Sequence, residues 1–183
     1  MIKSVEKSVE WYPRVLWVGI GCKRGTSQQL LETAIQQVCR ENQLAEGAIA
    51  GIATIDLKAD EIGLVELCRA RNWPLRTFSA DVLCFVSVPN PSVVVEAGVG
   101  TPSVAEAAAL CAAASVGVIR SSVHESPLRV SKQIFRLEGQ PGAVTVAIAQ
   151  TEPEYCPLAA SKIDLFNDSD EKVQHASNNR QDN

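Results

Sequence analysis

The sequence VLWVGIGCKRGTSQQLL, residues 15–31, decides the kind of fold that this chain is expected to adopt. Its first part, residues 15–20, is a continuous apolar run of the kind found in strands buried on both faces of a parallel sheet. A helix is predicted to follow, because Thr26 is a good N-cap and Gln29 stands at the capping-box position three residues on. The apolar stripe of that helix covers residues 30–38. A strand, a glycine-rich turn and a helix therefore form the first unit of the fold.

The alternation of strand and helix continues through the rest of the folded region. Further strands are predicted at residues 49–55 and 93–95, with a short one at residues 75–78. Apolar stretches at residues 116–119 and 143–149 predict the last two strands, which are separated by a polar segment that contains His124, Pro127 and Gly139. Helical periodicity predicts helices at residues 60–72, 80–86 and 102–115. Ser79 is the expected N-cap of the short helix, and Ser103 with Glu106 forms an S-x-x-E box at the start of the last one. This pattern predicts an α/β fold, a layered domain with a mainly parallel sheet flanked by helices.

Composition and charge divide the chain into three parts. With 183 residues, 46% of them hydrophobic, the chain has the size and composition of one soluble globular domain. We expect a flexible N-terminus at residues 1–13, a folded domain at residues 14–150 and a disordered acidic tail at residues 151–183. The tail carries the whole formal net charge of −4, so the folded part is neutral and has no footprint for a nucleic acid. No apolar run reaches the roughly 18 residues of a membrane helix, so the expected compartment is the cytoplasm.

The spacing of cysteine and histidine does not suggest a metal site. The six cysteines are scattered without a C-x-x-C pair, and both histidines lie far from them in the sequence. These spacings differ from those of structural zinc sites, so we expect reduced thiols and no metal bound by the protein.

The glycine-rich turn has the composition of an anion-binding loop. Gly19, Gly21 and Gly25 allow the backbone to approach a ligand, and the helix N-terminus after them offers free N–H groups. Lys23 and Arg24 add two positive charges beside that terminus. In a parallel α/β sheet, the carboxyl end of a strand is also where ligands tend to bind. The structural alternative is that the glycines only form a tight turn and the cations are solvated.

Two nucleotide-binding motifs fit this turn poorly. The phosphate loop of NTPases, G-x-x-x-x-G-K-S/T, requires a lysine after its last glycine, whereas Gly25 is followed by Thr26. The dinucleotide motif G-x-G-x-x-G has two residues between its second and third glycines, one fewer than this turn has between Gly21 and Gly25. A nucleotide-dependent enzyme is therefore the weakest functional alternative, since it rests on fold analogy alone.

Three blocks of the sequence together resemble the CbiG/CobE family. Residues 19–26 (GIGCKRGT) are similar to the family pattern G-x-G-C-R/K-R/K-G-T, residues 54–61 (TIDLKADE) to S-I-D-x-K-A-D-E, and residues 98–110 (GVGTPSVAEAAAL) to V-G-V-x-S-V-A-E-A-A-A-L. A later match is VTVAIA at residues 144–149. The blocks follow the family order over roughly residues 17–149. Two departures are Thr54, where the family usually has serine, and residues 120–142, which are longer and less similar.

The resemblance implies a role in cobalamin biosynthesis. In that family, the domain is the C-terminal half of cobalt-precorrin-5A hydrolase, which opens a lactone and releases acetaldehyde, or it occurs alone. We therefore expect the chain to bind a corrinoid or precorrin intermediate, as an accessory to that hydrolysis or a part of it. The implied partner is a separate chain that carries the N-terminal half of the hydrolase, or a precorrin methyltransferase. No cofactor of the protein's own is implied, and cobalt would enter with the substrate.

The expected substrate-binding residues lie in these blocks and just before the second glycine turn. They are Gly19, Gly21, Cys22, Lys23, Arg24, Gly25, Thr26, Thr54, Asp56, Lys58, Glu96, Gly98, Gly100, Thr101, Ser103 and Glu106. Lys58 is expected either to bind a substrate carboxylate or to form a surface pair with the acids around it. Glu106 is alternatively a helix-capping acid, and Asp60 or Glu61 alternatively favours a helix dipole.

A second interpretation is a complete small hydrolase that opens the lactone by itself. Such a reaction needs a general base to activate water, and the candidates are Asp56, Glu96 and His124. The N–H groups of either glycine turn are candidates to hold the oxyanion. No nucleophile–base pair is identifiable by spacing, and a solvated loop position is the alternative for His124.

Overall fold

The computed structural model describes residues 12–91, 103–114, 127–139 and 142–151. Five strands in these residues form one sheet in the order β3-β2-β1-β5-β4. The strands are β1 Leu16–Cys22, β2 Ile49–Ile55, β3 Leu75–Phe78, β4 Leu128–Phe135 and β5 Val144–Gln150. The helices are α1 Gln28–Glu41, α2 Ile62–Arg71, α3 Ala80–Cys84 and α5 Val104–Ala114, with the 3-10 turns η1 Glu46–Ala48 and η2 Asp56–Lys58 on either side of β2.

The sheet is mainly parallel and contains one reversed strand. β1 pairs with β2 and β2 with β3 in parallel, whereas β5 runs antiparallel to both β1 and β4. Four of the five strands therefore point the same way. The predicted α/β layered fold is confirmed, and a β4–β5 hairpin completes the sheet at one edge.

β4 corrects one expectation from the sequence. Leu128–Phe135 lies in the segment that the sequence pattern predicts to be a polar connection, yet it forms a strand at the edge of the sheet. An edge strand keeps one side in solvent, so LRVSKQIF mixes polar and apolar residues and lacks the continuous apolar run of a central strand. β5 confirms the predicted strand at residues 143–149 with a shift of one residue. The predicted strands at residues 93–95 and 116–119 lie outside the described residues.

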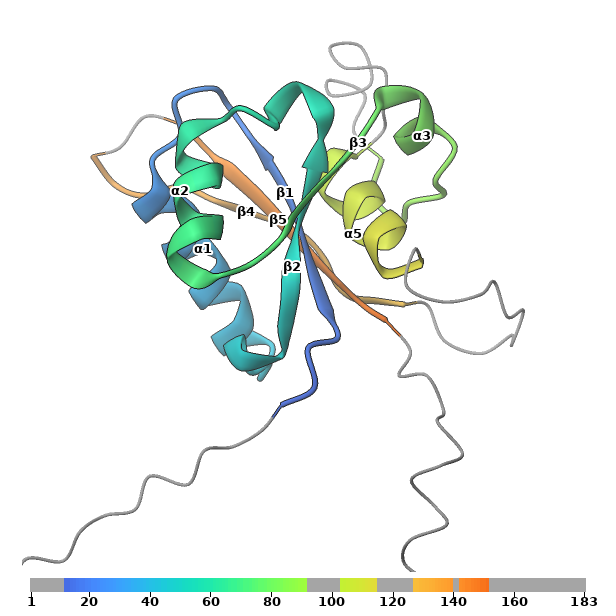
Figure 1. The fold of residues 1–183 in the computed structure, drawn as a ribbon, viewed down its shortest axis with the longest axis horizontal. Coiled ribbons are helices and arrows are strands. Elements are labelled where there is room, and N and C mark those ends of the chain that lie inside the picture. The colour runs from blue at the N-terminus through green and yellow to red at the C-terminus, as the bar shows by residue number, and fades with distance from the viewer. Residues whose placement is uncertain (1–11, 92–102, 115–126, 140–141, 152–183) are drawn as a thin grey trace, which may run out of the picture. The chain divides into compact units, whose positions relative to one another are not determined.

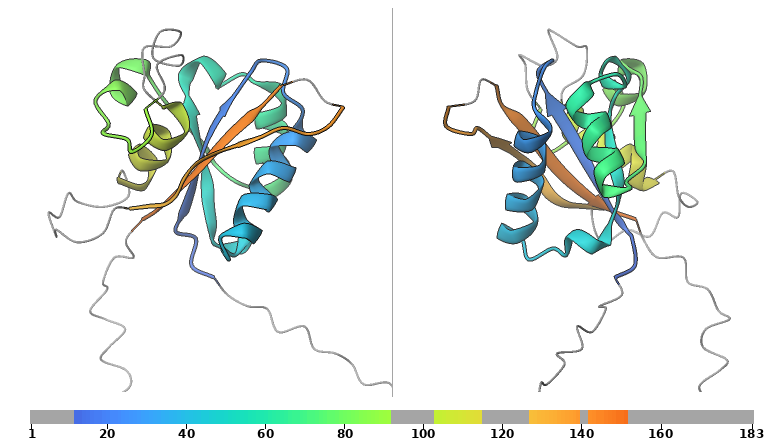
Figure 2. Two further views of the ribbon diagram at one scale, coloured as in Figure 1. Left: turned by 180° about the vertical axis from the view of Figure 1, so that it is seen from behind. Right: turned by 60° about the vertical axis from the view of Figure 1, so that its left-hand side comes forward.

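The helices cover both faces of the sheet (Figure 1, Figure 2). α1 and α2 pack on one face, where the core consists mainly of large aliphatic side chains, among them Val18, Ile20, Leu30, Leu31, Ile35, Val38, Ile52, Leu64 and Leu67. α5 and the short α3 pack on the other face, where the core includes Trp17, Ala53, Ile55, Leu83, Ala107, Ala108, Ala109 and Ala112. None of the helices in the part of the chain that the structure describes is long and apolar enough to cross a membrane.

α5 lies unusually close to the central strand because of a glycine. A Cβ atom added at Gly19 would fall 1.9 Å from the backbone oxygen of Ala105, so any side chain at this position would push the helix away. At the other end of α5, Arg76 donates a hydrogen bond of 3.3 Å to the carbonyl of Ala112 and stacks over the ring of Trp17. These contacts fix α5 along the sheet, with its N-terminus at the carboxyl end of β1.

The start of α1 differs from the prediction by one residue. Ser27 is the N-cap, and its side chain accepts a hydrogen bond from the N–H of Leu30, whereas the Thr26 hydroxyl donates to the carbonyl of Lys23 at 2.7 Å. The predicted Thr26 cap is therefore wrong, because that hydroxyl closes the glycine-rich turn instead. Gly25 adopts a φ of +77° within the turn, a conformation that favours glycine. The predicted cap of α3 is confirmed, since Ser79 accepts from the N–H of Val82.

Candidate functional site

A cavity of about 340 Å³ lies at the carboxyl ends of β1 and β2, beside the N-terminus of α5. Its lining residues are Gly21, Cys22, Lys23, Thr54, Ile55, Lys58, Ser103, Val104, Ala105, Lys132, Ile134, Ala143 and Thr145. The volume is at the lower end of the range of small-molecule pockets, roughly 300–1,000 Å³. The location is the one where open α/β sheets usually bind ligands.

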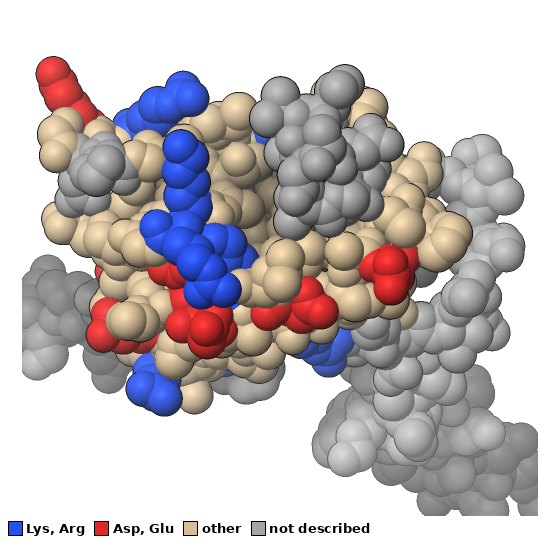
Figure 3. All heavy atoms as spheres, turned by 90° about the horizontal axis from the view of Figure 1, so that it is seen from above, with Lys and Arg blue, Asp and Glu red and all other residues tan. Residues whose placement is uncertain are grey.

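Three lysines from three separate elements line this cavity. Lys23 follows β1, Lys58 closes η2, and Lys132 lies on β4, so residues distant in sequence converge on one site. Figure 3 shows this end of the sheet from above, with Lys and Arg side chains in a band beside a hollow and Asp and Glu along one side of the band. The N-terminus of α5 adds a partial positive charge and N–H groups without partners inside the helix. The arrangement suits an anionic ligand.

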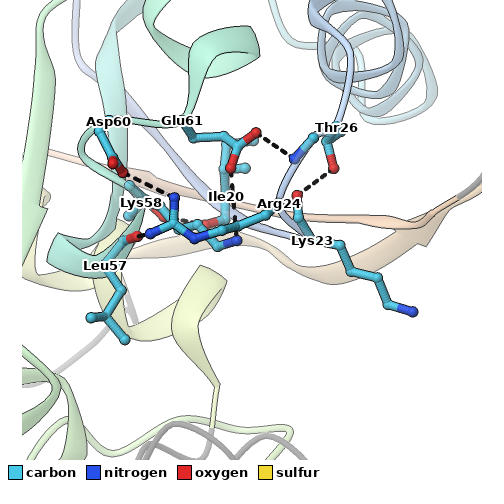
Figure 4. Close-up of polar contacts among 10 residues, drawn as sticks. Ile20, Lys23, Arg24, Thr26, Leu57, Lys58, Asp60 and Glu61 are labelled. Carbon is cyan, nitrogen blue, oxygen red and sulfur yellow. Dashed lines mark hydrogen bonds and ion pairs between the residues drawn. The ribbon is translucent and has the colours of Figure 1, made fainter.

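Glu61 contacts both Lys58 and the glycine-rich turn that carries Lys23. Its carboxylate is only 4% exposed, and one oxygen accepts a hydrogen bond of 2.7 Å from the N–H of Gly25. The other oxygen lies 3.9 Å from the ammonium of Lys58, a distance too long for a hydrogen bond. Glu61 therefore joins the glycine-rich turn to η2, as Figure 4 shows, and leaves the donors of Lys58 available to a ligand.

The two cations of the glycine-rich turn have different surroundings. Arg24 reaches across to the segment after β2, where it pairs with Asp60 at 3.2 Å and donates to the carbonyl of Leu57 at 2.8 Å. Lys23 extends away from that contact and lines the cavity (Figure 4). The sequence pattern groups both as ligand-binding, whereas the geometry gives Arg24 a contact that holds the turn in place.

Other predicted site residues are distributed between the cavity and its surroundings. Thr54 is fully buried, and its hydroxyl donates to the carbonyl of Ile20 at 2.8 Å, so it ties β2 to β1 under the cavity. Asp56 is exposed at the start of η2 and does not line the cavity. Burial raises the pKa of the Cys22 thiol, and the positive charge of Lys58 opposes that rise only in part. Cys22 is therefore a neutral lining group at neutral pH.

Glu106 positions the third lysine. It is completely buried, and one carboxylate oxygen accepts from the side-chain amide of Asn90 at 2.9 Å and from the backbone N–H of Lys132 at 3.1 Å. The ammonium of Lys132 in turn donates to the carbonyl of Asn90. The second carboxylate oxygen of Glu106 is buried without a hydrogen-bond partner among the described residues. Glu106 thus links α5 to β4 beside the cavity, a role that the predicted capping box does not suggest.

Some residues of the site were not predicted from the sequence, and some predicted residues lie outside the part of the chain that the structure describes. Lys132, Ile134, Ala143 and Thr145 come from the β4–β5 hairpin, whose first strand the sequence pattern missed. The predicted residues Glu96, Gly98, Gly100, Thr101 and His124 lie outside the described residues. Among the residues that are described, no three His, Cys, Asp or Glu side chains lie close enough to hold a metal ion.

Comparison with known proteins identifies the class of this domain. The family described as "Cobalamin synthesis G C-terminus" matches residues 16–149, so the chain belongs to that family of cobalamin biosynthesis proteins. It is 36% identical over 106 residues to the cobalt-precorrin-5A hydrolase of Priestia megaterium, which covers 58% of this chain and 28% of that protein. It is 34% identical over 71 residues to the enzyme of the same name from Salmonella typhimurium strain LT2, which covers 39% of this chain and 20% of that protein. The matches thus span about a quarter of the length of these relatives.

A solved structure shares the fold. The crystal structure of CobE, a protein from the cobalamin (vitamin B12) biosynthetic pathway, superposes with a TM-score of 0.62 and 29% sequence identity. The superposition covers 74% of this chain and 93% of CobE. The resemblance to the CbiG/CobE family is therefore confirmed, and the chain is related to cobalt-precorrin-5A hydrolase.

Proposed function

We propose that this domain binds a corrin-ring intermediate in the lysine-lined cavity, as an accessory to cobalt-precorrin-5A hydrolysis or a part of it. The observation that carries the proposal is the convergence of Lys23, Lys58 and Lys132 on one cavity beside a helix N-terminus. Corrin intermediates are flat macrocycles fringed with acetate and propionate groups. Ammonium groups and free N–H groups are suitable partners for such carboxylates, because charge-assisted hydrogen bonds are the strong ones.

The lining of the cavity favours binding over catalysis. Among the described lining residues there is no carboxylate and no imidazole, although lactone opening needs a general base to activate water. Asp56 lies outside the cavity, and the nearby carboxylate of Glu61 is occupied by Gly25 and Lys58. The carboxylate of Glu106 is completely buried behind Lys132 and does not line the cavity. We therefore assign the activation of water to groups outside the described residues, and propose a partner that carries the remainder of the hydrolase or a precorrin methyltransferase.

Two assays test this proposal. Titration of the purified chain with metal-free and cobalt-containing corrin intermediates, followed by visible absorption, should give saturable binding that weakens as salt rises, since partly exposed ion pairs are screened. Acetaldehyde release from cobalt-precorrin-5A should be absent with the chain alone and should appear when the partner chain is added. Absence of binding to every intermediate contradicts the proposal, and acetaldehyde release by the chain alone supports the complete small hydrolase instead.

A further inference from the structure

The size of the cavity limits how much of a corrin intermediate it can hold. Its volume of about 340 Å³ is at the lower end of the range of pockets that bury a small molecule, roughly 300–1,000 Å³. The ring system of a corrin intermediate is far larger than this. The cavity can therefore take carboxylate arms at the edge of the macrocycle, where an acetate and a propionate stand side by side on each pyrrole-derived ring before modification.

The charge around the cavity matches the same two arms. Three lysines line it, and among the described residues their salt-bridge partner is Glu61, which lies beside Lys58. Glu106, completely buried behind Lys132, is the second carboxylate of the site, so three ammonium groups and two carboxylates leave a surplus of one positive charge. The N-terminus of α5 adds a partial positive charge. Lys58 and Lys132 are half-buried and can each take one carboxylate of a ligand, whereas Lys23 is exposed.

The lysines reach the cavity from different parts of the sheet. Lys58 enters from the end of β2 and Lys132 from β4, and these strands are separated in the sheet by β1 and β5. The N-terminus of α5 lies between them at Ser103, Val104 and Ala105, which also line the cavity. Lys132 is held in place through Asn90 and Glu106, and Lys58 through Glu61. Two separately anchored ammonium groups therefore face one small space.

We propose that the cavity binds the adjacent acetate and propionate arms of one pyrrole-derived ring edge-on, an inference that rests on the proposed function. The apolar lining residues Ile55, Val104 and Ala143 contact the methylene groups of the arms. The centre of the macrocycle, with any cobalt that it carries, stays outside the cavity. Recognition is therefore set by the pair of carboxylate arms and is independent of the metal.

Two commercially available macrocycles separate this mode of binding from recognition of the ring. Uroporphyrin carries an acetate and a propionate on every ring, whereas coproporphyrin replaces each acetate with a methyl group. Fluorescence titration of the full chain should show at least tenfold tighter binding of uroporphyrin, which corresponds to one charge-assisted contact. Metal-free and zinc uroporphyrin should bind equally within about twofold, because the ring centre makes no contact with the cavity.

Variants of the two anchored lysines test the site itself. Lys58→Ala and Lys132→Ala should each weaken uroporphyrin binding about tenfold and reduce its preference over coproporphyrin. Lys58→Met, which keeps the apolar stem of the side chain, replaces Lys58→Ala if thermal melts show that the alanine variant is unfolded. The matched control is Arg40→Ala, which removes one exposed positive charge from the last turn of α1, outside the cavity, and should leave both affinities unchanged.

The outcomes distinguish this inference from the proposed function. Equal affinity for the two porphyrins, no binding of either, or an effect of zinc larger than about twofold overturns edge-on recognition of the arms. A chain that prefers uroporphyrin in the predicted way but binds no corrin intermediate keeps the inference about the cavity and loses the proposed function.

Discussion

The two faces of the sheet are built from different kinds of side chain. Between the sheet and α1 and α2, the core is filled by leucine, isoleucine and valine. Between the sheet and α5, it is filled mainly by alanines of the helix, with Gly19 of β1 directly under Ala105. Large side chains bury more apolar area and stabilise the fold more, whereas small ones let the backbones approach each other.

This difference separates stability from the site. The α1/α2 face supplies most of the buried aliphatic surface of the domain. To the lining of the cavity it contributes only the glycine-rich turn. The α5 face brings a helix N-terminus and, through Glu106, the edge strand β4 to the ends of β1 and β2. Substitutions on the first face should therefore change stability alone, and substitutions on the second face should change stability and binding together.

The largest expected effect is on the α1/α2 face. Leu31→Ala should lower the free energy of unfolding by about 2–5 kcal/mol, because Leu31 is completely buried and its loss leaves a cavity. Binding of a corrin intermediate, measured below the melting temperature, should be unchanged. Denaturant unfolding and a binding isotherm on the same sample measure both quantities. A loss of affinity in the folded variant would break the proposed separation of the two faces.

The next effect is on the α5 face. Gly19→Ala places a Cβ 1.9 Å from the backbone oxygen of Ala105, and this oxygen can move away only if helix α5 moves with it. We expect a loss of stability of about 1–3 kcal/mol and a loss of binding, since Ala105 lines the cavity. Gly47→Ala is the matched control, because Gly47 lies in η1 outside the cavity and its added Cβ would lie 3.4 Å from a ring carbon of Tyr12, an ordinary contact. Unchanged binding in Gly19→Ala would show that the position of α5 is not critical for the site.

Alkaline pH should weaken the α1/α2 face. Burial raises the pKa of both Cys39 in α1 and Cys68 in α2 to about 11. In the unfolded chain these thiols ionise nearer pH 8.5–9, so stability is fully present below that range and is lost as pH rises through 11. At pH 10 the loss should be about 1.5 kcal/mol per thiol. Unfolding curves between pH 7 and 10 measure it.

The control for this pH dependence removes the two thiols. The double variant Cys39→Ala with Cys68→Ala should be less stable at pH 7 but should show a flatter dependence of stability on pH above 8. An unchanged slope would mean that other groups cause the alkaline loss.

Elements with a strong local pattern could be predicted from the sequence. Ile49–Ile55 has the predicted bounds, since an apolar run between clear breakers marks a buried strand. Leu75–Phe78 also has the predicted bounds, although LRTF is only partly buried. β4 was missed because an edge strand needs no continuous apolar run. The choice between Thr26 and Ser27 as the N-cap is not encoded locally, because both residues are good caps. It is fixed by the bond from Thr26 to Lys23 that closes the turn.

The site could be predicted only where its residues are close together in the sequence. The glycine-rich turn and Lys58 lie in recognisable blocks, and the structure brings both to one cavity. Lys132 has no local signal, because it is placed by Glu106, 26 residues earlier in the chain. In the same way, Arg24 and Lys23 are equivalent in sequence, and only the contact of Arg24 with Asp60, 36 residues away, distinguishes them.

The smallest effects on stability are expected within the glycine-rich turn, where two variants test this distinction. From the sequence alone, replacing Lys23 and Arg24 together with alanine is predicted to weaken corrinoid binding by about 2–4 kcal/mol with little change in stability. The structure predicts different effects for the two single variants. Lys23→Ala should weaken binding by about 1.5–3 kcal/mol and leave stability unchanged, because Lys23 lines the cavity. Arg24→Ala should lower stability by less than about 1 kcal/mol, since its pair with Asp60 is exposed, and should affect binding less than Lys23→Ala does.

Isotherms at low and high salt, with thermal melts alongside, separate the two cations. The Lys23 contribution to binding should shrink as salt rises, because a partly exposed ion pair between the ligand and the protein is screened. If Arg24→Ala weakens binding more than Lys23→Ala, then the turn must rearrange on binding so that Arg24 leaves Asp60 for the ligand. If neither variant changes the affinity, the turn is structural, and the lysines of η2 and β4 alone hold the ligand.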